Sequence, residues 1–132
     1  MMVANGDRSD NRRRPATSTP PGDSERLDVP DIVQALQAGL GQGLLAVIVN
    51  RDVRTMARWA SATVAPPASV ERTLRDTFQI FQMITAVDSP AVARAWFAGL
   101  NPSLDDRSPA ETIADGDLRE VMAAARLFVA GN

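Results

Sequence analysis

The chain has 132 residues and a formal net charge of −2, and this length suits a single modest hydrophobic core. It contains no cysteine, histidine or tyrosine, and all 14 of its basic residues are arginine. These absences exclude disulfides and thiolate chemistry and remove the commonest general base and metal ligand, so we predict no catalytic residue, no metal site and no cofactor.

The first segment, residues 1–27, is rich in Arg, Asp, Ser, Thr and Pro and shows no apolar period, which predicts a disordered tail. Its triple arginine, Arg12 to Arg14, could touch phosphate, but a solvated tail is the favoured interpretation because nothing orders the run. The polar start lacks the apolar region of a signal peptide, and no stretch approaches the roughly 20 apolar residues of a membrane span. We therefore predict a cytoplasmic protein with no membrane partner.

Residues 28–68 read as three short helices followed by a loop, ATVAPPA, whose adjacent prolines cannot continue a helix. The helix signals are aspartate at a start, proline in a first turn and glycine or asparagine at an end. The predicted helices cover residues 28–40, 41–50 and 51–61, with Asp28 and Asp52 as N-caps, Pro30 in the first turn, Gly39 near the first end and Asn50 at the second.

These three helices have the spacing of a helix-turn-helix. Ala46 is the small residue at the helix crossing, and Asn50 tolerates the left-handed conformation that the turn needs. Met56 and Trp59, spaced i and i+3, are predicted to face inward. A recognition helix reads base edges with its N-terminal residues, and arginine pairs bidentately with guanine. The predicted DNA contacts on this helix and its leading edge are Arg51, Val53, Arg54, Thr55 and Arg58.

The stretch QGLLAVIVNRDVRTMARWAS resembles the helix-turn-helix of Xre-type repressors, including the Arg58–Trp59 pair and Gln42 at the start of the first helix, which becomes a further DNA-binding candidate. It departs from that pattern at Gly41 and Gly43, which weaken the helix, and at Asp52, which repels phosphate. The alternative is a small helical bundle with solvated arginines, but DNA contact is favoured because a helix presented in a groove makes use of this spacing.

The remaining residues, 69–132, predict four more helices. SVERTLRDTFQIFQMITAV has a broad apolar face and is the longest. A second helix follows Ser89 and Pro90 and stops at Gly99. Two capping boxes, Ser108 with Glu111 and Asp117 with Glu120, open the last two helices. Because no alternating strand pattern of useful length is present, the predicted fold is all-α.

The stretch between the last apolar helices, WFAGLNPSLDDRSPAETIADGD, holds five carboxylates. A metal site is disfavoured because the acids lack EF-hand spacing. Acid–base catalysis is disfavoured because the adjacent Asp105 and Asp106 point apart on most backbones and have no apolar surroundings to shift a pKa. Most of this charge is explained by capping.

The charge is unevenly distributed along the chain. Residues 51–76 carry five Arg against three acids, whereas residues 77–132 carry four Arg against seven acids. This basic middle and acidic end could form two surfaces for different partners.

Apart from its carboxylates, the stretch WFAGLNPSLDDRSPAETIADGD contains a second set of residues and is followed by an apolar helix. The set is Trp96, Asn101–Pro102, Leu104, Arg107, Pro109 and Gly116. It resembles the toxin-binding domain of the MbcA/ParS/Xre antitoxin family, although Asp106 stands where Gly is commoner. With the helix-turn-helix, the resemblance covers roughly residues 30–132.

This resemblance implies a type II antitoxin with two regions, residues 28–68 for DNA and residues 69–132 for the toxin. The toxin would be a RES-domain enzyme that consumes NAD⁺, and the antitoxin would repress its own operon. The implied assemblies are a homodimer on operator DNA and a larger hetero-oligomer with the toxin. The alternative is a stand-alone helix-turn-helix regulator whose C-terminal region serves dimerisation or a ligand. The predicted toxin contacts are Asn101, Leu104, Arg107, Arg126 and Asn132.

Overall fold

The computed structural model describes residues 27–132, so all but the last residue of the predicted tail at residues 1–27 lies outside the described part of the chain. Within the described residues the fold is all-α, as predicted, and no helix there is long and apolar enough to cross a membrane. The elements are α1 (Val29–Leu40), α2 (Gln42–Val49), α3 (Val53–Ala60), α4 (Ala68–Thr85), α5 (Pro90–Ala98), the 3₁₀ turn η2 (Pro102–Leu104), α6 (Pro109–Ala114) and α7 (Leu118–Ala130).

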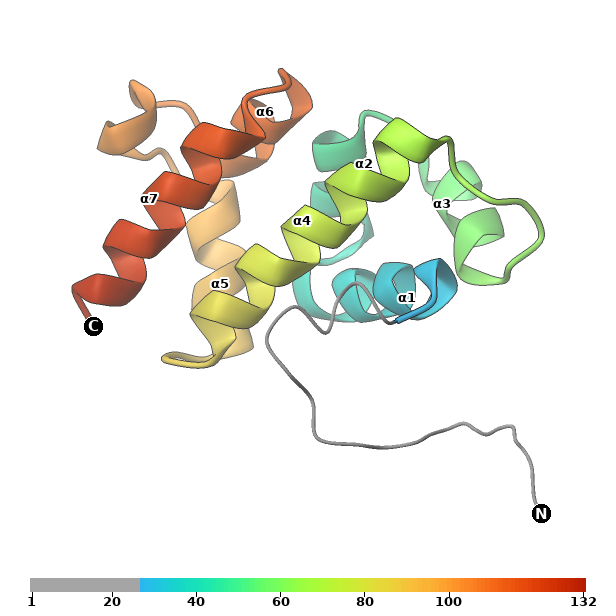
Figure 1. Ribbon diagram of the computed structural model, residues 1–132, viewed down its shortest axis with the longest axis horizontal. Helices are drawn as coiled ribbons and strands as arrows, with labels where there is room; N and C mark the ends of the chain where they lie inside the picture. Colours follow the sequence, from blue (N-terminus) through green and yellow to red (C-terminus); the bar gives the residue numbers. More distant parts are fainter. Residues whose placement is uncertain (1–26) are drawn as a thin grey trace, which may run out of the picture.

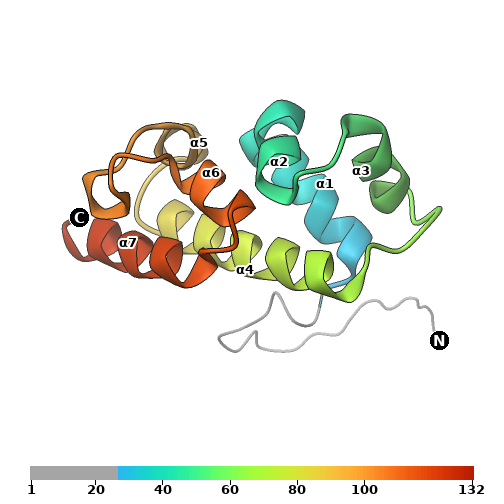
Figure 2. The ribbon, with the colours of Figure 1, turned by 90° about the horizontal axis from the view of Figure 1, so that it is seen from above.

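Helix α4 runs the length of the molecule and connects its two ends (Figures 1 and 2). Helices α1, α2 and α3 gather at one end, and α5, α6 and α7 gather at the other. The two groups also contact each other directly, because α1 packs against α5 and α2 packs against α6. Helix α1 packs against α4 as well. The predicted regions 28–68 and 69–132 therefore lie against each other along α4.

A single cluster of buried apolar side chains extends through both regions. Helix α1 contributes Ile32, Val33, Leu36 and Leu40, all fully buried, and α7 contributes Val121 and Ala125 from the far end of the same cluster. Burial of apolar surface is the dominant favourable term in folding. The two regions therefore share one hydrophobic core.

Helix α1 ends at Leu40, as predicted. The helix continues through Gly39 and is followed by its C-cap Gly41, whose φ of 89° is a conformation that favours glycine. Gly39 has a packing role instead, because a Cβ at this position would overlap the ring of Phe81 on α4. Asp28 occupies the predicted N-cap position, but its side chain makes no capping hydrogen bond.

The serine caps of α5 and α6 form as predicted. The hydroxyl of Ser89 accepts the Val92 N–H at 3.1 Å, and the hydroxyl of Ser108 accepts the Glu111 N–H at 3.1 Å. The second half of the Ser108 box is absent, because the Glu111 carboxylate makes no hydrogen bond back to the serine backbone. The two caps nevertheless satisfy backbone donors that would otherwise be orphaned at the helix starts.

The buried hydroxyl of Thr77 on α4 has no hydrogen-bond partner among the described residues. An unsatisfied buried hydroxyl is destabilising, whereas a methyl group of similar shape carries no such cost. Thr77→Val is therefore expected to raise the free energy of unfolding by about 1 kcal/mol, measured by chemical denaturation. Thr73→Val is the matched control, because its hydroxyl already donates to the Ser69 carbonyl at 3.2 Å. Equal stability changes in the two variants would contradict the assignment.

Candidate functional site

The turn between α2 and α3 has the geometry of a helix-turn-helix. Asn50 adopts the predicted left-handed conformation, with φ 55° and ψ 48°. Its N–H donates to the Val47 carbonyl at 3.2 Å, and the next N–H, of Arg51, donates to the Ala46 carbonyl at 3.2 Å. These two bonds are the Schellman pattern, which ends one helix and re-aims the chain within a few residues.

Helix α3 turns one face inward and one outward. Met56 and Trp59 are buried, as their spacing predicted, while Arg54 and Arg58 are exposed. No ion pair to either of these two arginines occurs in residues 27–132. The outward face of α3 therefore carries two exposed arginines without a close ion pair, and exposed positive charge is the property that a phosphate-contacting surface needs.

Asp52 begins α3 as its predicted N-cap and accepts the Thr55 N–H at 2.7 Å. Hydrogen bonds from the Thr55 backbone and hydroxyl hold the pKa of Asp52 below its usual 3.8 against an opposing effect of desolvation, and the nearby charges of Arg54 and Arg58 lower it slightly further. Because the folded pKa is depressed, this cap supports folding above the unfolded pKa and loses that support as the pH falls through the folded value. At neutral pH the group is charged and stabilises the helix start.

The other DNA-binding candidates occupy the edges of this surface. Gln42 is exposed at the first position of α2, and Val53 is 38% exposed at the first position of α3. Thr55 is half-buried beside the Asp52 cap. The Arg51 guanidinium bends back onto its own turn and donates to the Asn50 carbonyl at 3.0 Å, so part of its hydrogen-bonding capacity is already used.

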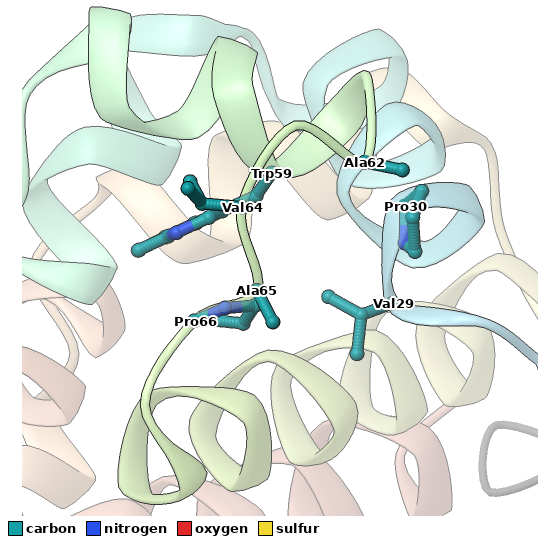
Figure 3. Close-up of a pocket in the computed structure, with 7 residues that line it drawn as sticks. All are labelled: Val29, Pro30, Trp59, Ala62, Val64, Ala65 and Pro66. Carbon is teal, nitrogen blue, oxygen red and sulfur yellow. The ribbon is translucent and has the colours of Figure 1, made fainter.

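A small pocket of about 120 Å³ lies behind α3, between the start of α1 and the loop that leads to α4 (Figure 3). Ala62 turns this loop with a left-handed φ of 63°. No lining residue has an acid, base or nucleophile in its side chain, so the pocket offers no catalytic group. The lining residues are Val29, Pro30, Trp59, Ala62, Val64, Ala65 and Pro66.

At the other end of the molecule, Arg107 is the centre of a charge network. Its guanidinium lies 3.0 Å from Asp115, 3.5 Å from Asp117 and 3.8 Å from Glu120. The predicted capping box of Asp117 with Glu120 is therefore wrong: Asp117 makes no side-chain cap, and both carboxylates face Arg107 instead. The network ties the loop before α6 to the turn before α7.

The loop that carries Arg107 is closed on itself. The Asn101 N–H donates to the Arg107 carbonyl at 3.1 Å, and the Asn101 side chain caps η2 by accepting the Ser103 N–H at 2.8 Å. Leu104 is 1% exposed and anchors the loop in the core. Asp105 and Asp106 both adopt left-handed conformations, with φ 57° and 62°. Of the predicted toxin contacts, Asn101, Leu104 and Arg107 thus lie together and shape this loop.

The remaining two candidates are Arg126 on α7 and Asn132 just beyond its end. Arg126 and Asn132 are exposed, and the Asn132 amide donates to the Phe128 carbonyl at 3.2 Å. Phe128 is half-buried and packs against Trp96, with ring centroids 6.2 Å apart. Two leucines in this region are largely exposed to solvent, Leu100 at 74% and Leu127 at 65%. This end of the molecule therefore offers apolar and charged side chains to a partner.

Sequence reasoning missed one part of this end, the hollow between α4 and α7 to which Arg119 contributes with Arg126. The two arginines are spaced i and i+7, a helical repeat that places them on one face and could have revealed them. No cluster of three or more potential metal ligands of the His, Cys, Asp or Glu type occurs in the described part of the chain.

The chain matches no protein-family model and no curated protein. Among solved structures it is similar to a chain in the crystal structure of the M. tuberculosis MbcT–MbcA toxin–antitoxin complex. The two chains superpose with a TM-score of 0.65 and 24% sequence identity, over 77% of this chain and 94% of the other. The fold that the sequence resemblance implied is therefore confirmed.

Proposed function

We propose that this protein is the antitoxin of a type II toxin–antitoxin system, which binds and neutralises a RES-domain toxin that consumes NAD⁺. The observation that carries this proposal is the shared fold with a chain of a toxin–antitoxin complex, which extends over 94% of that chain. The pattern from Trp96 to the end of α7 supports it independently, because the same residues carry the family resemblance in the sequence.

The toxin is proposed to dock on the α5–α7 end. Arg126 and Asn132 are accessible for direct contact, whereas Asn101, Leu104 and Arg107 act by holding the loop in shape. A rigid loop loses less conformational entropy on binding than a mobile one. The exposed carboxylates of Asp105 and Asp106 suit a toxin whose cleft is basic enough to hold the phosphates of a dinucleotide.

We propose a second activity for the opposite end, binding of the operator of its own operon through α3. Its support is the left-handed Asn50 turn, the buried Met56 and Trp59, and the outward arginines Arg54 and Arg58. A homodimer would place two such helices in successive major grooves, about 34 Å apart on a palindromic site. Toxin-bound forms would then be larger hetero-oligomers.

Coexpression tests the antitoxin assignment. The antitoxin assignment predicts that a RES-type protein is encoded beside the gene of this chain. The full chain is expected to restore growth of cells that express that protein, and to purify with it as a complex. Deleting residues 130–132 removes only exposed residues, so we expect an almost unchanged melting temperature and weaker rescue. A full chain that folds but neither binds nor rescues would refute the assignment.

A stand-alone transcriptional regulator is the second candidate, favoured by the α2–α3 geometry alone, which does not depend on a toxin. In that case the α5–α7 end would serve dimerisation or a ligand. Operator binding without any effect on the neighbouring protein would support this candidate. Rescue of growth by the Arg54→Ala/Arg58→Ala variant would instead support the antitoxin, because this variant separates neutralisation of the toxin from DNA binding.

A further inference from the structure

The hollow between α4 and α7 has a volume of about 390 Å³ and is lined by Asp76, Leu118, Arg119, Met122 and Arg126. The two helices lie side by side in both views of the molecule (Figures 1 and 2) and are in contact. Leu118 and Met122 are half-buried and pack against the core from this side. They give the hollow an apolar floor, and methionine is a side chain that adapts to varied partners.

The edge of this hollow is positively charged. Arg119 and Arg126 are exposed and two helical turns apart on α7, and neither forms an ion pair within residues 27–132. Asp76 is the single acidic lining residue, and it already has an interaction of its own. Two arginines at the edge of an apolar floor are suited to carboxylates, which the planar guanidinium binds with two parallel hydrogen bonds.

The opposite flank of α7 has the reverse charge. Glu120 points toward Arg107, as do Asp115 and Asp117, and Asp105 and Asp106 are exposed in the neighbouring loop. Helix α7 thus separates an acidic edge from the basic hollow. A partner that covers both flanks must itself carry charge of both signs in a matching arrangement, which favours one orientation of binding.

We propose that the α4–α7 hollow docks an amphipathic segment of the toxin, with apolar side chains on Leu118 and Met122 and carboxylates on Arg119 and Arg126. This inference rests on the proposed antitoxin function and specifies how the partner is held. An apolar floor favours a polypeptide over nucleic acid, because phosphate contacts require positive charge but no apolar surface.

Single charge reversals in the full-length chain test the docking site. Arg119→Glu and Arg126→Glu are each expected to weaken binding of the purified neighbouring RES-type protein by about tenfold or more, measured by calorimetry. Arg72→Glu is the matched control, because Arg72 is an exposed arginine near the start of α4, does not line the hollow and forms no ion pair in the described chain. It changes the net charge equally and should alter affinity less than about threefold. Unchanged melting temperatures would show that all three variants fold.

The outcomes separate the two proposals. If the wild-type chain does not bind the RES-type protein, the proposed function and this docking site are both refuted. If wild type binds and both reversals match the Arg72→Glu control, the docking site is refuted and the antitoxin function stands. Reversals that change only operator affinity, or only the oligomeric state by light scattering, would assign the hollow to DNA or to a second copy and would equally overturn toxin docking.

Discussion

Leu36→Ala is expected to lower the free energy of unfolding of the protein by about 2–5 kcal/mol. Leu36 is fully buried on α1, the helix that packs against α3, α4 and α5. Truncation to alanine removes favourable transfer free energy and leaves a cavity that the surrounding helices fill only in part. Because small domains have a total stability of about 5–15 kcal/mol, this loss is a large fraction of the whole.

The two tryptophans allow this loss to be followed at both ends of the molecule. Trp59 lies on α3 and Trp96 on α5, so variants that retain one tryptophan report one end each during denaturant titration. Because α1 is part of a core shared by both regions, Leu36→Ala should shift the two transitions together. Leu36→Met conserves volume and should cost less than about 1.5 kcal/mol. A Trp96 transition that keeps its midpoint while the Trp59 transition shifts would show that residues 69–132 fold independently.

The turn between α2 and α3 could be predicted from the sequence because its determinants are local. Asn50 supplies the left-handed turn, Asp52 caps α3 through Thr55 three residues later, and Met56 and Trp59 share a face by helical spacing. Each of these relations joins residues at most four apart, where backbone geometry alone fixes which groups meet. The all-α class follows from the same local periods.

The charge network around Arg107 could not be predicted in this way. Asp117 and Glu120 have the spacing of a capping box, but a guanidinium ten residues before Asp117 attracts both carboxylates. Sequence spacing identifies the cap but does not show that a distant cation competes for the same group. The contact between Gly39 and Phe81 could not be predicted from local sequence either, because it depends on how closely α1 crosses α4. The shared core is likewise a consequence of packing between distant segments.

Replacing Arg54 and Arg58 together by alanine is expected to weaken binding to the operator upstream of the gene by at least about a hundredfold. Both side chains are exposed on the outer face of α3 and form no ion pair in the described chain. An arginine that is bidentate to guanine contributes about 1–3 kcal/mol of discrimination, and each 1.4 kcal/mol is tenfold. Titration of labelled operator DNA at several salt concentrations measures both the affinity and its salt slope.

The salt slope separates phosphate contacts from base contacts. Each arginine that engages phosphate should lower the slope of log K against log salt by about 0.9 when it is removed. The Arg54→Lys/Arg58→Lys variant preserves the charge but not the guanidinium fork, so it should retain the slope while losing preference for the operator over unrelated DNA. An alanine variant with wild-type affinity and slope would show that α3 does not contact DNA. The exposed arginines would then be solvated residues on a helical bundle, and repression, if present, would require a different surface of the chain.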